Sequence, residues 1–370
     1  DTLASALIAN GVHLVGRSFK YHRPRGILSA GPEEPNALVE LRSGARREPN
    51  TRATQAELFD GLEARSQNRF PSLGFDLGAV NGFFAPMLGA GFYYKTFMWP
   101  AAFWEKLYEP LIRRAAGLGR APEGPDPDHY ERAHLHCDVL VVGSGPAGLM
   151  AALAAGRAGA RVALLEEHAL LGGRLLAEAE EVDGIPGADW ARGVEAELAA
   201  LPRVRILRRT SAFAVLDGGL VAAVERVADH LPTPPAHRPR QRYWKIAARR
   251  IVLAAGALER PVVFGGNDRP GVMLAGAVRS YLNRYAALPG RRAVVFTAGD
   301  DGWRTVADLH RAGAGIEAVV DARPEVSPAQ ARLAQPAGAR LVTGGSVIGT
   351  RGRLRLTAVE FVDARGRVEG

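Results

Sequence analysis

The chain has 370 residues, enough for two or three domains, and its 47 basic and 39 acidic residues give a formal net charge of +8. All but four of the basic residues are arginines, and they are spread along the chain without interleaved aromatic residues, which argues against a nucleic-acid partner. The single cysteine, Cys137, excludes a disulfide framework and a redox-active cysteine pair. With so little cysteine, we expect a cytoplasmic protein. The longest uncharged stretch, residues 77–94, contains four glycines and a proline, so we expect no membrane helix.

Residues 1–45 predict a small α+β module. A helix is expected over residues 2–10, followed by strands over 12–15 and 37–41. This is the pattern of half a β-grasp, ferredoxin-like fold. The loop between the two strands contains no cysteine, so we expect a module without an iron–sulfur cluster. The basic run Arg17–Arg25 in this loop either faces solvent or a phosphate group, or docks a partner subunit.

Residues 46–135 have weak periodicity and many glycines and prolines, which predicts a connecting segment. Between Gly91 and Pro110 this segment is rich in aromatic residues. Such density suits a subunit interface, although a packed core linker is the alternative. Residues 113–129 then predict a proline-rich connector.

A dinucleotide-binding domain is predicted over residues 136–290. The apolar strand 139–142 leads into the loop Gly-Ser-Gly-Pro-Ala-Gly at 143–148, and an Ala/Leu-rich helix follows. A second apolar strand, 162–165, ends at Glu166. Together these elements form a βαβ unit with the fingerprint of a Rossmann fold in its first turn.

Each glycine of this loop has an expected role. Gly143 permits the tight turn, Gly145 lets the backbone approach a pyrophosphate, and Gly148 lets the helix pack closely on the sheet. Pro146 and Ala147 open the helix, whose free N–H groups and dipole favour phosphate. Glu166 is placed to accept hydrogen bonds from ribose hydroxyls, and an acid there favours NAD or FAD over NADP. The alternative is a glycine turn that serves packing alone.

Two later segments are expected to return to the same cofactor. After Glu166, the pair Gly172-Gly173 lets the chain fold back, and Arg174 is a candidate contact for ribose or pyrophosphate, with a surface arginine as the alternative. A helix (189–201), a strand (204–207) and a β-hairpin up to Ile251 follow. The buried strand then ends in small residues, so that Ala255 and Gly256 would lie against the dinucleotide.

Residues 291–370 predict a second, incomplete nucleotide-type domain. Its βαβ unit comprises strand 293–296, helix 303–312 and strand 316–320, but the turn between the first strand and the helix lacks spaced glycines. Asp300 and Asp301 stand at the helix N-terminus instead, where they stabilise the helix and would repel a pyrophosphate. We therefore expect one dinucleotide site and a purely structural second domain.

Four fragments of this chain carry a resemblance to a known family. They are GRSFKYHRPRGILSAGPEEPNALVEL, GFYYKTFMWP with FWEKLYEPLIRRAAGLG, HCDVLVVGSGPAGL, and AAGALERPVVFGGNDRPGVM. They resemble the α subunits of heterotetrameric sarcosine oxidases. The resemblance implies a ferredoxin-like module without its cluster, then a two-dinucleotide domain that binds NAD⁺ non-catalytically. It also implies a C-terminal folate-binding domain beyond this sequence, which agrees with a chain that starts without methionine and ends directly after a strand-like run.

The resemblance further implies the partners and cofactors. In that family a flavin-bearing β subunit oxidises sarcosine at FAD, and electrons pass through FMN at the α/β interface to oxygen, giving hydrogen peroxide; smaller subunits complete the assembly. The NAD⁺ contacts carried over by motif are Ala147, Glu166, Glu167, His168, Arg174 and Ala212. Related opine and proline dehydrogenase α subunits hold FAD in the same fold, so FAD is the alternative cofactor.

Within this sequence we predict neither catalytic residues nor a metal site. The histidines are scattered, and no Ser/His/Asp set occurs at motif spacing. Two other functions remain open. One is a self-sufficient NADH-dependent flavoprotein reductase, which the missing cysteine pair and the acidic turn disfavour. The other is a scaffold with an empty Rossmann pocket.

Overall fold

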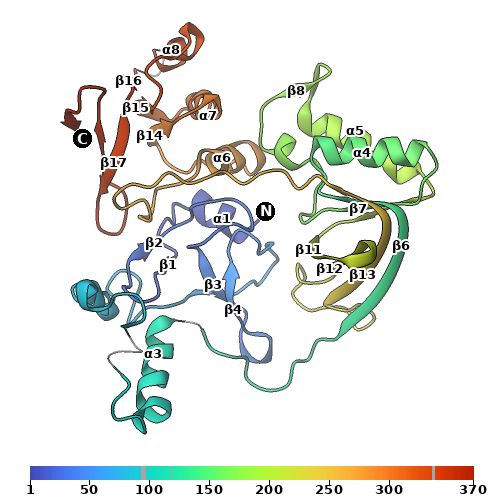
Figure 1. Cartoon of the computed structure of the whole chain (residues 1–370), viewed down its shortest axis with the longest axis horizontal. Helices are drawn as coiled ribbons and strands as arrows, with labels where there is room; N and C mark the ends of the chain where they lie inside the picture. Colours follow the sequence, from blue (N-terminus) through green and yellow to red (C-terminus); the bar gives the residue numbers. More distant parts are fainter. Residues whose placement is uncertain (93–96, 118, 336–337) are drawn as a thin grey trace. The chain divides into compact units, whose positions relative to one another are not determined.

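The computed structural model describes residues 1–92, 97–117, 119–335 and 338–370. The chain folds into two compact units, each of which is described here by itself. The first unit contains residues 1–58, 62–125 and 260–370, and the second contains residues 59–61 and 126–259. Figure 1 follows the chain through both in colour.

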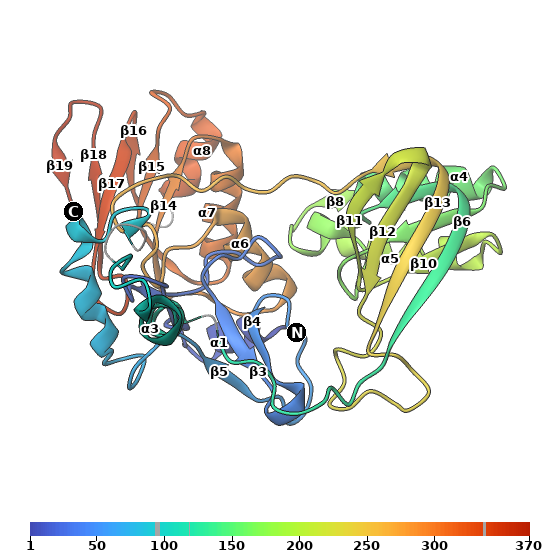
Figure 2. The same cartoon turned by 60° about the horizontal axis from the view of Figure 1, so that its bottom comes forward.

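The second unit is built on a six-stranded sheet with the order β10-β7-β6-β13-β12-β11 (Figure 2). The neighbouring strands β10, β7, β6 and β13 are parallel to one another, whereas β12 runs antiparallel to both of its neighbours, β13 and β11. The strands are β6 (Tyr130–Val142), β7 (Val162–Leu165), β10 (Val204–Leu207), β11 (Thr210–Leu216), β12 (Leu220–Glu225) and β13 (Gln241–Leu253). This confirms the predicted βαβ unit and hairpin.

Helices α4 (Pro146–Arg157) and α5 (Gly187–Ala200) pack together on one face of this sheet (Figures 1 and 2). Alternate residues of the buried strand β7 point to two cores, one beneath the helices and one on the opposite face. Two short strands, β8 (Glu181–Val182) and β9 (Ile185–Pro186), form a hairpin before α5. The helices thus cover the face from which the glycine loop leaves the sheet.

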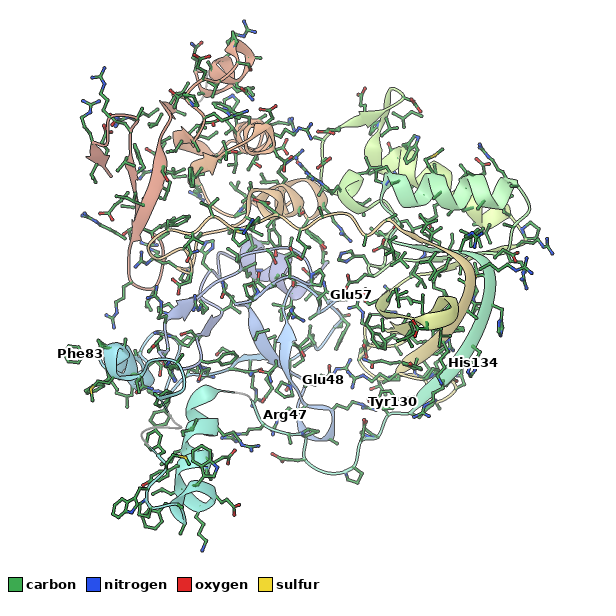
Figure 3. The ribbon with its side chains drawn as sticks, viewed as in Figure 1. Arg47, Glu48, Glu57, Phe83, Tyr130 and His134 are labelled. Atoms are coloured by element: carbon green, nitrogen blue, oxygen red, sulfur yellow. The ribbon has the colours of Figure 1, made fainter. Side chains whose placement is uncertain are left out.

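Strand β6 begins six residues before the predicted start of this domain at residue 136. It pairs with β13 from its first residue, Tyr130, opposite Gln241. Tyr130 and His134 both lie on this added length (Figure 3). Strand β6 starts where its pairing with β13 starts. The apolar run in the sequence covers only the later part of the strand, so it does not reveal this start.

The N-terminal part of the first unit contains a helix and a small antiparallel sheet with the order β4-β3-β5. The elements are α1 (Leu3–Ala9), β3 (Leu38–Leu41), β4 (Glu48–Arg52) and β5 (Ala64–Ser66), with a separate two-stranded ribbon of β1 (Gly16–Arg17) and β2 (Pro24–Arg25). The helix is as predicted and begins with a capping box at Thr2. The prediction of a strand over 12–15 was wrong, because regular pairing begins only at Gly16.

One hydrophobic core joins this module to a segment far along the chain. Ile8 and Val39 share it with Ala56, and also with Ala277 and Tyr281. Helix α6 (Ala275–Arg279) and the π-turn η7 (Ser280–Arg284) supply this later segment. The predicted divisions at residues 45, 135 and 290 therefore differ from the compact units, because segments distant in sequence bury their apolar faces together.

The aromatic-rich segment forms an exposed arm, defined here as residues 70–92 and 97–111. It contains the 3₁₀ turns η2 (Leu77–Gly82) and η3 (Ala85–Met87), the π-turn η4 (Trp104–Tyr108) and the start of α3 (Glu109–Ala116). Phe83 is 85% exposed and Trp99 is 84% exposed, and Figure 3 shows Phe83 on the arm. Side chains so exposed do not form a core linker. Residues 93–96 of the predicted interface segment lie outside the described residues, and α3 occupies the start of the predicted connector.

The C-terminal part contains the second βαβ unit and a final antiparallel sheet. The parallel sheet has the order β14-β15-β16, and the last sheet has the order β17-β18-β19. The elements are β14 (Arg292–Thr297), α7 (Asp300–Arg311), β15 (Gly315–Asp321), α8 (Pro328–Ala334), β16 (Arg340–Thr343), β17 (Ser346–Arg351), β18 (Ala358–Val362) and β19 (Val368–Glu369). Among the described residues, no helix has both the length and the apolar character that crossing a bilayer requires.

Candidate dinucleotide-binding site

The glycine loop between β6 and α4 is held by two close backbone contacts. Gly143 has a φ of +97°, and a Cβ there would lie 2.4 Å from the carbonyl oxygen of Ala254. A Cβ on Gly148 would lie 1.9 Å from the carbonyl oxygen of Gly143. Neither position accepts a side chain, because backbone atoms stand in the way. Packing therefore requires these two glycines whether or not a ligand is bound.

Gly145 differs from its two neighbours, since a Cβ there would meet nothing within 4 Å. The first hydrogen bond inside α4 runs from the amide of Leu149 to the carbonyl of Gly145, at 2.9 Å. The N–H groups of Ala147 and Gly148 precede it, so the helix offers them no carbonyl, and Pro146 has no N–H to satisfy. These donors and the open space beside Gly145 suit a bound phosphate group.

Glu166 stands at the carboxyl end of β7, beside the glycine loop, and is only 6% exposed. Its Oε2 accepts hydrogen bonds from the Ser144 amide, at 3.1 Å, and from the Ser144 hydroxyl. Its Oε1 accepts one from the amide of His168, at 2.8 Å. The carboxylate is thus fixed in orientation, while Oε1 keeps a second lone pair for a ribose hydroxyl.

Ser144 is the residue that sequence reasoning missed. It is fully buried, and besides contacting Glu166 its carbonyl accepts the amide of Gly172 at 3.0 Å. Its hydroxyl also lies 3.3 Å from that amide nitrogen, which donates to it. The signal available in the sequence was a serine between two glycines of the loop, since its hydroxyl can bond to a neighbouring polar group.

The segment after Glu166 returns to the glycine loop, as predicted for Gly172-Gly173. Gly173 has a φ of +54°, and a Cβ on it would lie 2.9 Å from the Cα of Gly145. Arg174, the predicted ribose or pyrophosphate contact, has a side chain that is 61% exposed and forms an ion pair with Glu178 at 2.5 Å. The backbone of this segment therefore lies against the glycine loop, while the side chain of Arg174 is exposed, and its contact with a ribose or pyrophosphate stays a prediction.

The start of β11 also reaches the end of β7. The amide of Thr210 donates to the carbonyl of Glu166 at 2.7 Å, and a side-chain nitrogen of Arg226 donates to the carbonyl of Glu167 at 2.6 Å. Ala212, the predicted adenine contact, follows two residues after Thr210 and pairs with Ala223. The predicted residues Glu166, Glu167 and His168 are thus close to the strand that carries Ala212.

The end of β13 completes the surroundings of the loop. The Ala254 amide donates to the carbonyl of Val142 at 2.8 Å, and Ala254 makes the closest approach to Gly143. Ala255 and Gly256, the residues named from the sequence, follow as exposed backbone, with Gly256 at a φ of +71°. Ala255 also lies beside the loop, since a Cβ on Gly143 would be 3.1 Å from its Cα, and the contact of Ala255 and Gly256 with a dinucleotide stays a prediction.

The turn of the second βαβ unit has the same topology and different contacts. The hydroxyl of Thr297 donates to the carbonyl of Gly299 at 2.8 Å and accepts from its amide at 3.1 Å. Asp300 accepts hydrogen bonds from Arg323 at 2.7 Å and from Gln330 at 2.6 Å. Asp301 pairs with Arg279 at 3.4 Å.

These ion pairs correct the sequence argument about the second turn. Arginine partners offset much of the charge of both aspartates, so electrostatic repulsion of a pyrophosphate is weaker than the bare carboxylates suggested. Hydrogen bonds from Arg323 and Gln330 hold the pKa of Asp300 below its ordinary value. What sets this turn apart is that the Thr297 hydroxyl engages both backbone polar groups of Gly299, while Asp300 and Asp301 are paired with side chains of the same unit.

Asp321 occupies the place in this second unit that Glu166 holds in the first. It is fully buried and accepts hydrogen bonds from the indole of Trp303 at 2.8 Å and from Arg323 at 2.8 Å. Its carboxylate therefore joins β15 to α7. Among the described residues, no group of three or more His, Cys, Asp or Glu side chains is placed to hold a metal ion.

The basic run Arg17–Arg25 is largely engaged within its own unit. The side chain of Arg17 is buried, donates to the carbonyls of Leu73 and His22, and lies 3.9 Å from Asp76. Arg23 and Arg25 both pair with Asp268. Much of this run therefore stabilises the unit, which reduces the charge it offers to a partner or phosphate.

Two family models match parts of this chain. Residues 1–69 match the 2Fe-2S iron-sulfur cluster binding domain, and residues 138–207 match the FAD dependent oxidoreductase family. The second match covers the glycine loop, α4, β7, Glu166 and α5. L-Proline dehydrogenase from P. horikoshii has the same fold, with a TM-score of 0.59 and 20% identity, covering 100% of this chain and 55% of that one.

Curated relatives extend over the whole sequence. The sarcosine oxidase α subunit of Rhizobium meliloti (strain 1021) is 58% identical over 369 residues, which are 100% of this chain and 37% of the relative. Its counterpart from Corynebacterium sp. (strain P-1) is 44% identical over 352 residues, 95% of this chain and 32% of the relative. An opine oxidase polypeptide of Agrobacterium tumefaciens (strain Ach5) is 32% identical over 167 residues, 44% of this chain and 32% of the relative.

The chain spans about a third of the length of these curated relatives. The resemblance inferred from the four sequence fragments is confirmed, because the similarity to both sarcosine oxidase subunits covers nearly all of the chain. The ferredoxin-type domain and the Rossmann-type domain are also confirmed. Over its length this chain belongs with the sarcosine oxidase α subunits and carries the dinucleotide fold of FAD-dependent oxidoreductases.

Proposed function

We propose that this chain is the dinucleotide-holding part of the α subunit of a multi-subunit, cytoplasmic amine oxidase, and that its own site has no catalytic step. The complex would oxidise sarcosine, with oxygen and water, to glycine, formaldehyde and hydrogen peroxide. Where folate is bound, methylene-tetrahydrofolate would replace formaldehyde. The observation that carries the proposal is the glycine loop with its fixed Glu166, in a chain 58% identical to a sarcosine oxidase α subunit.

The residues of the loop fit a dinucleotide. The amides of Ala147 and Gly148 would bind the pyrophosphate, and Gly145 leaves room for its approach. Glu166 would accept a ribose hydroxyl, with Gly173 and the start of β11 enclosing the adenosine side. The bound dinucleotide would take no part in turnover, and we assign these residues only to binding and orientation.

NAD⁺ is the proposed ligand, and FAD is the alternative at the same site. The acid at the end of β7 suits either of them and disfavours a 2′-phosphate. The family match to FAD dependent oxidoreductases supports the alternative. If NAD⁺ occupies this site, the flavins of the full complex would be held mainly by the β subunit. If FAD occupies it, one flavin would be held here.

Denaturing the full-length protein after purification, with identification of the released ligand by mass spectrometry, tests this proposal. We expect about one NAD⁺ per chain and no NADH oxidase activity in the absence of the other subunits. Release of FAD would favour the alternative cofactor. Turnover of NADH with a bound flavin would instead favour the self-sufficient reductase, and a chain that stays empty at saturating nucleotide would favour a scaffold.

The exposed arm is the surface that we propose docks the flavin-bearing β subunit. Its apolar side chains include Phe83, Met87 and Trp99, each more than three-quarters exposed. Clusters of exposed large apolar residues are typical of interfaces with other proteins. The double variant Phe83→Ser/Trp99→Ser should lose co-purification with a co-expressed β subunit while keeping its nucleotide. Phe213→Ser, which changes a 60% exposed aromatic residue in the other unit, is the control, and equal loss of β subunit in both variants would contradict the proposal.

A further inference from the structure

The loop that joins β2 to β3, residues 26–37, is folded around a buried carboxylate. Glu34 is 1% exposed, although it is charged and lies in a segment without helix or strand. Isolated charges are almost never buried in proteins unless donors surround them. The surroundings of Glu34 therefore indicate what this loop is built to hold.

Four backbone amides of the same loop converge on the Glu34 carboxylate. Oε2 accepts from Leu28 at 2.9 Å and from Ser29 at 2.7 Å, and Oε1 accepts from Asn36 at 2.8 Å and from Ala37 at 3.0 Å. The Ser29 hydroxyl adds a fifth hydrogen bond at 3.2 Å. Among the ion pairs of the described residues, none involves Glu34, so amides rather than a cation compensate its charge.

Such a concave set of N–H groups is an anion site formed by backbone, and Fe–S clusters commonly bind in concavities of this kind. Residues 1–69 match a 2Fe-2S cluster binding domain. Those residues contain no cysteine, because the only cysteine of the sequence is Cys137. The amides of this loop converge as they would around an anionic cluster, and the Glu34 carboxylate of the same loop lies among them.

We propose that the Glu34 carboxylate occupies the anion position of a former cluster site and replaces the cluster as the centre around which the loop folds. Two contacts tie this centre to the rest of the unit. The hydroxyl of Tyr281 donates to the carbonyl of Ser29 at 2.8 Å, and the hydroxyl of Thr54 donates to the carbonyl of Gly31 at 2.7 Å. The loop, fixed by its own carboxylate, supports the shared core of the module without a metal. This inference does not depend on the proposed dinucleotide function.

Chemical rescue of the full-length protein tests the proposal. Glu34→Ala removes the carboxylate and leaves space for a small anion, so the midpoint of thermal unfolding should fall by about 5–10 °C. Millimolar acetate should then raise the midpoint of this variant well above any effect on the unchanged protein, while acetamide and equimolar chloride should not. Glu33→Ala, at the partly exposed neighbouring position, is the control and should behave like the unchanged protein. A Glu34→Ala midpoint equal to that of the control, or no selective effect of acetate, would overturn the proposal.

Two measurements on the unchanged protein keep the proposal open to refutation if Glu34→Ala fails to fold. Hydrogen–deuterium exchange should show the amides of Leu28, Ser29, Asn36 and Ala37 protected like those of strand β3, although they lie in a loop. Iron and acid-labile sulfide should be far below one cluster per chain after anaerobic purification. Rapid exchange of these amides, or a full cluster in this module, would contradict the assignment of Glu34.

Discussion

The two βαβ units of this chain share a topology and differ in how their turns use polar groups. In the first, Oε1 of Glu166 accepts a hydrogen bond from His168 and keeps a second lone pair for a ligand, beside the open start of α4. In the second, the Thr297 hydroxyl engages both backbone polar groups of Gly299, and both carboxylate oxygens of Asp321 accept hydrogen bonds from Trp303 or Arg323. The difference teaches that two turns of one topology can offer a ligand different polar groups, according to how far their own side chains already engage the acid at the end of the second strand.

The largest expected effect is a loss of nucleotide affinity when a methyl group is added to the first turn, compared with the same addition to the second turn. Gly145→Ala should weaken binding of the dinucleotide identified by mass spectrometry by about tenfold to a hundredfold, because the new Cβ takes the space through which the phosphates approach. Gly299→Ala is the matched variant, since a Cβ there also meets nothing within 4 Å. It should leave the affinity unchanged. Isothermal titration of both variants measures the difference.

Thermal unfolding completes that test. Neither alanine meets another atom within 4 Å, so both variants should fold, and a loss of affinity in Gly145→Ala can then be assigned to the ligand. If Gly299→Ala weakened binding as much as Gly145→Ala, the second turn would be the nucleotide site and the comparison would be reversed.

A smaller effect is expected at the acids that end the second strands. Glu166→Gln should weaken nucleotide binding by about tenfold, because a charge-assisted hydrogen bond to the ribose is replaced by a neutral one. Asp321→Asn should leave binding unchanged and lower the free energy of unfolding by about 1–3 kcal/mol, because Arg323 and Trp303 lose their charged acceptor. Titration calorimetry and chemical denaturation separate the two outcomes, and a common loss of binding would contradict distinct roles.

The parts of the fold that could be predicted are those encoded by neighbouring residues. Strand β7 has four consecutive buried apolar residues, and its predicted bounds, 162–165, match the structure. The glycine loop could be predicted as well, because Gly143 and Gly148 meet each other across five residues. Local sequence is informative where the contacts it makes are local.

Contacts between distant residues explain what could not be predicted. The bond from Ser144 to Glu166 joins residues 22 apart, and that from Tyr281 to Ser29 joins residues 252 apart. No periodicity in one segment shows that another will share its core, so the predicted boundaries near 45 and 290 do not coincide with the bounds of the compact units. The charges at Asp300 and Asp301 were likewise judged without their arginine partners, which follow or precede them by about twenty residues.

The smallest expected effect concerns the pH dependence of the second unit. Hydrogen bonds from Arg323 and Gln330 lower the pKa of Asp300 in the folded chain. A carboxyl group whose folded pKa lies below its unfolded value stabilises the fold above about pH 4, and this stabilisation is lost as the pH falls further. Unfolding midpoints measured from pH 6 down to pH 3 should therefore fall slightly less in Asp300→Asn than in the unchanged protein.

The expected difference is small because Asp300 is exposed, and solvent screens its ion pair with Arg323. Asp60→Asn is the control, since that exposed aspartate makes no ion pair with the described residues, and its acid profile should follow the unchanged protein. An Asp300→Asn profile that fell more steeply than the unchanged one would mean that acid protonates this carboxyl more readily in the folded chain than in the unfolded one. The arginine pairing that distinguishes the second turn would then contribute nothing in solution, and the bare-carboxylate explanation for its lack of a nucleotide would regain its force.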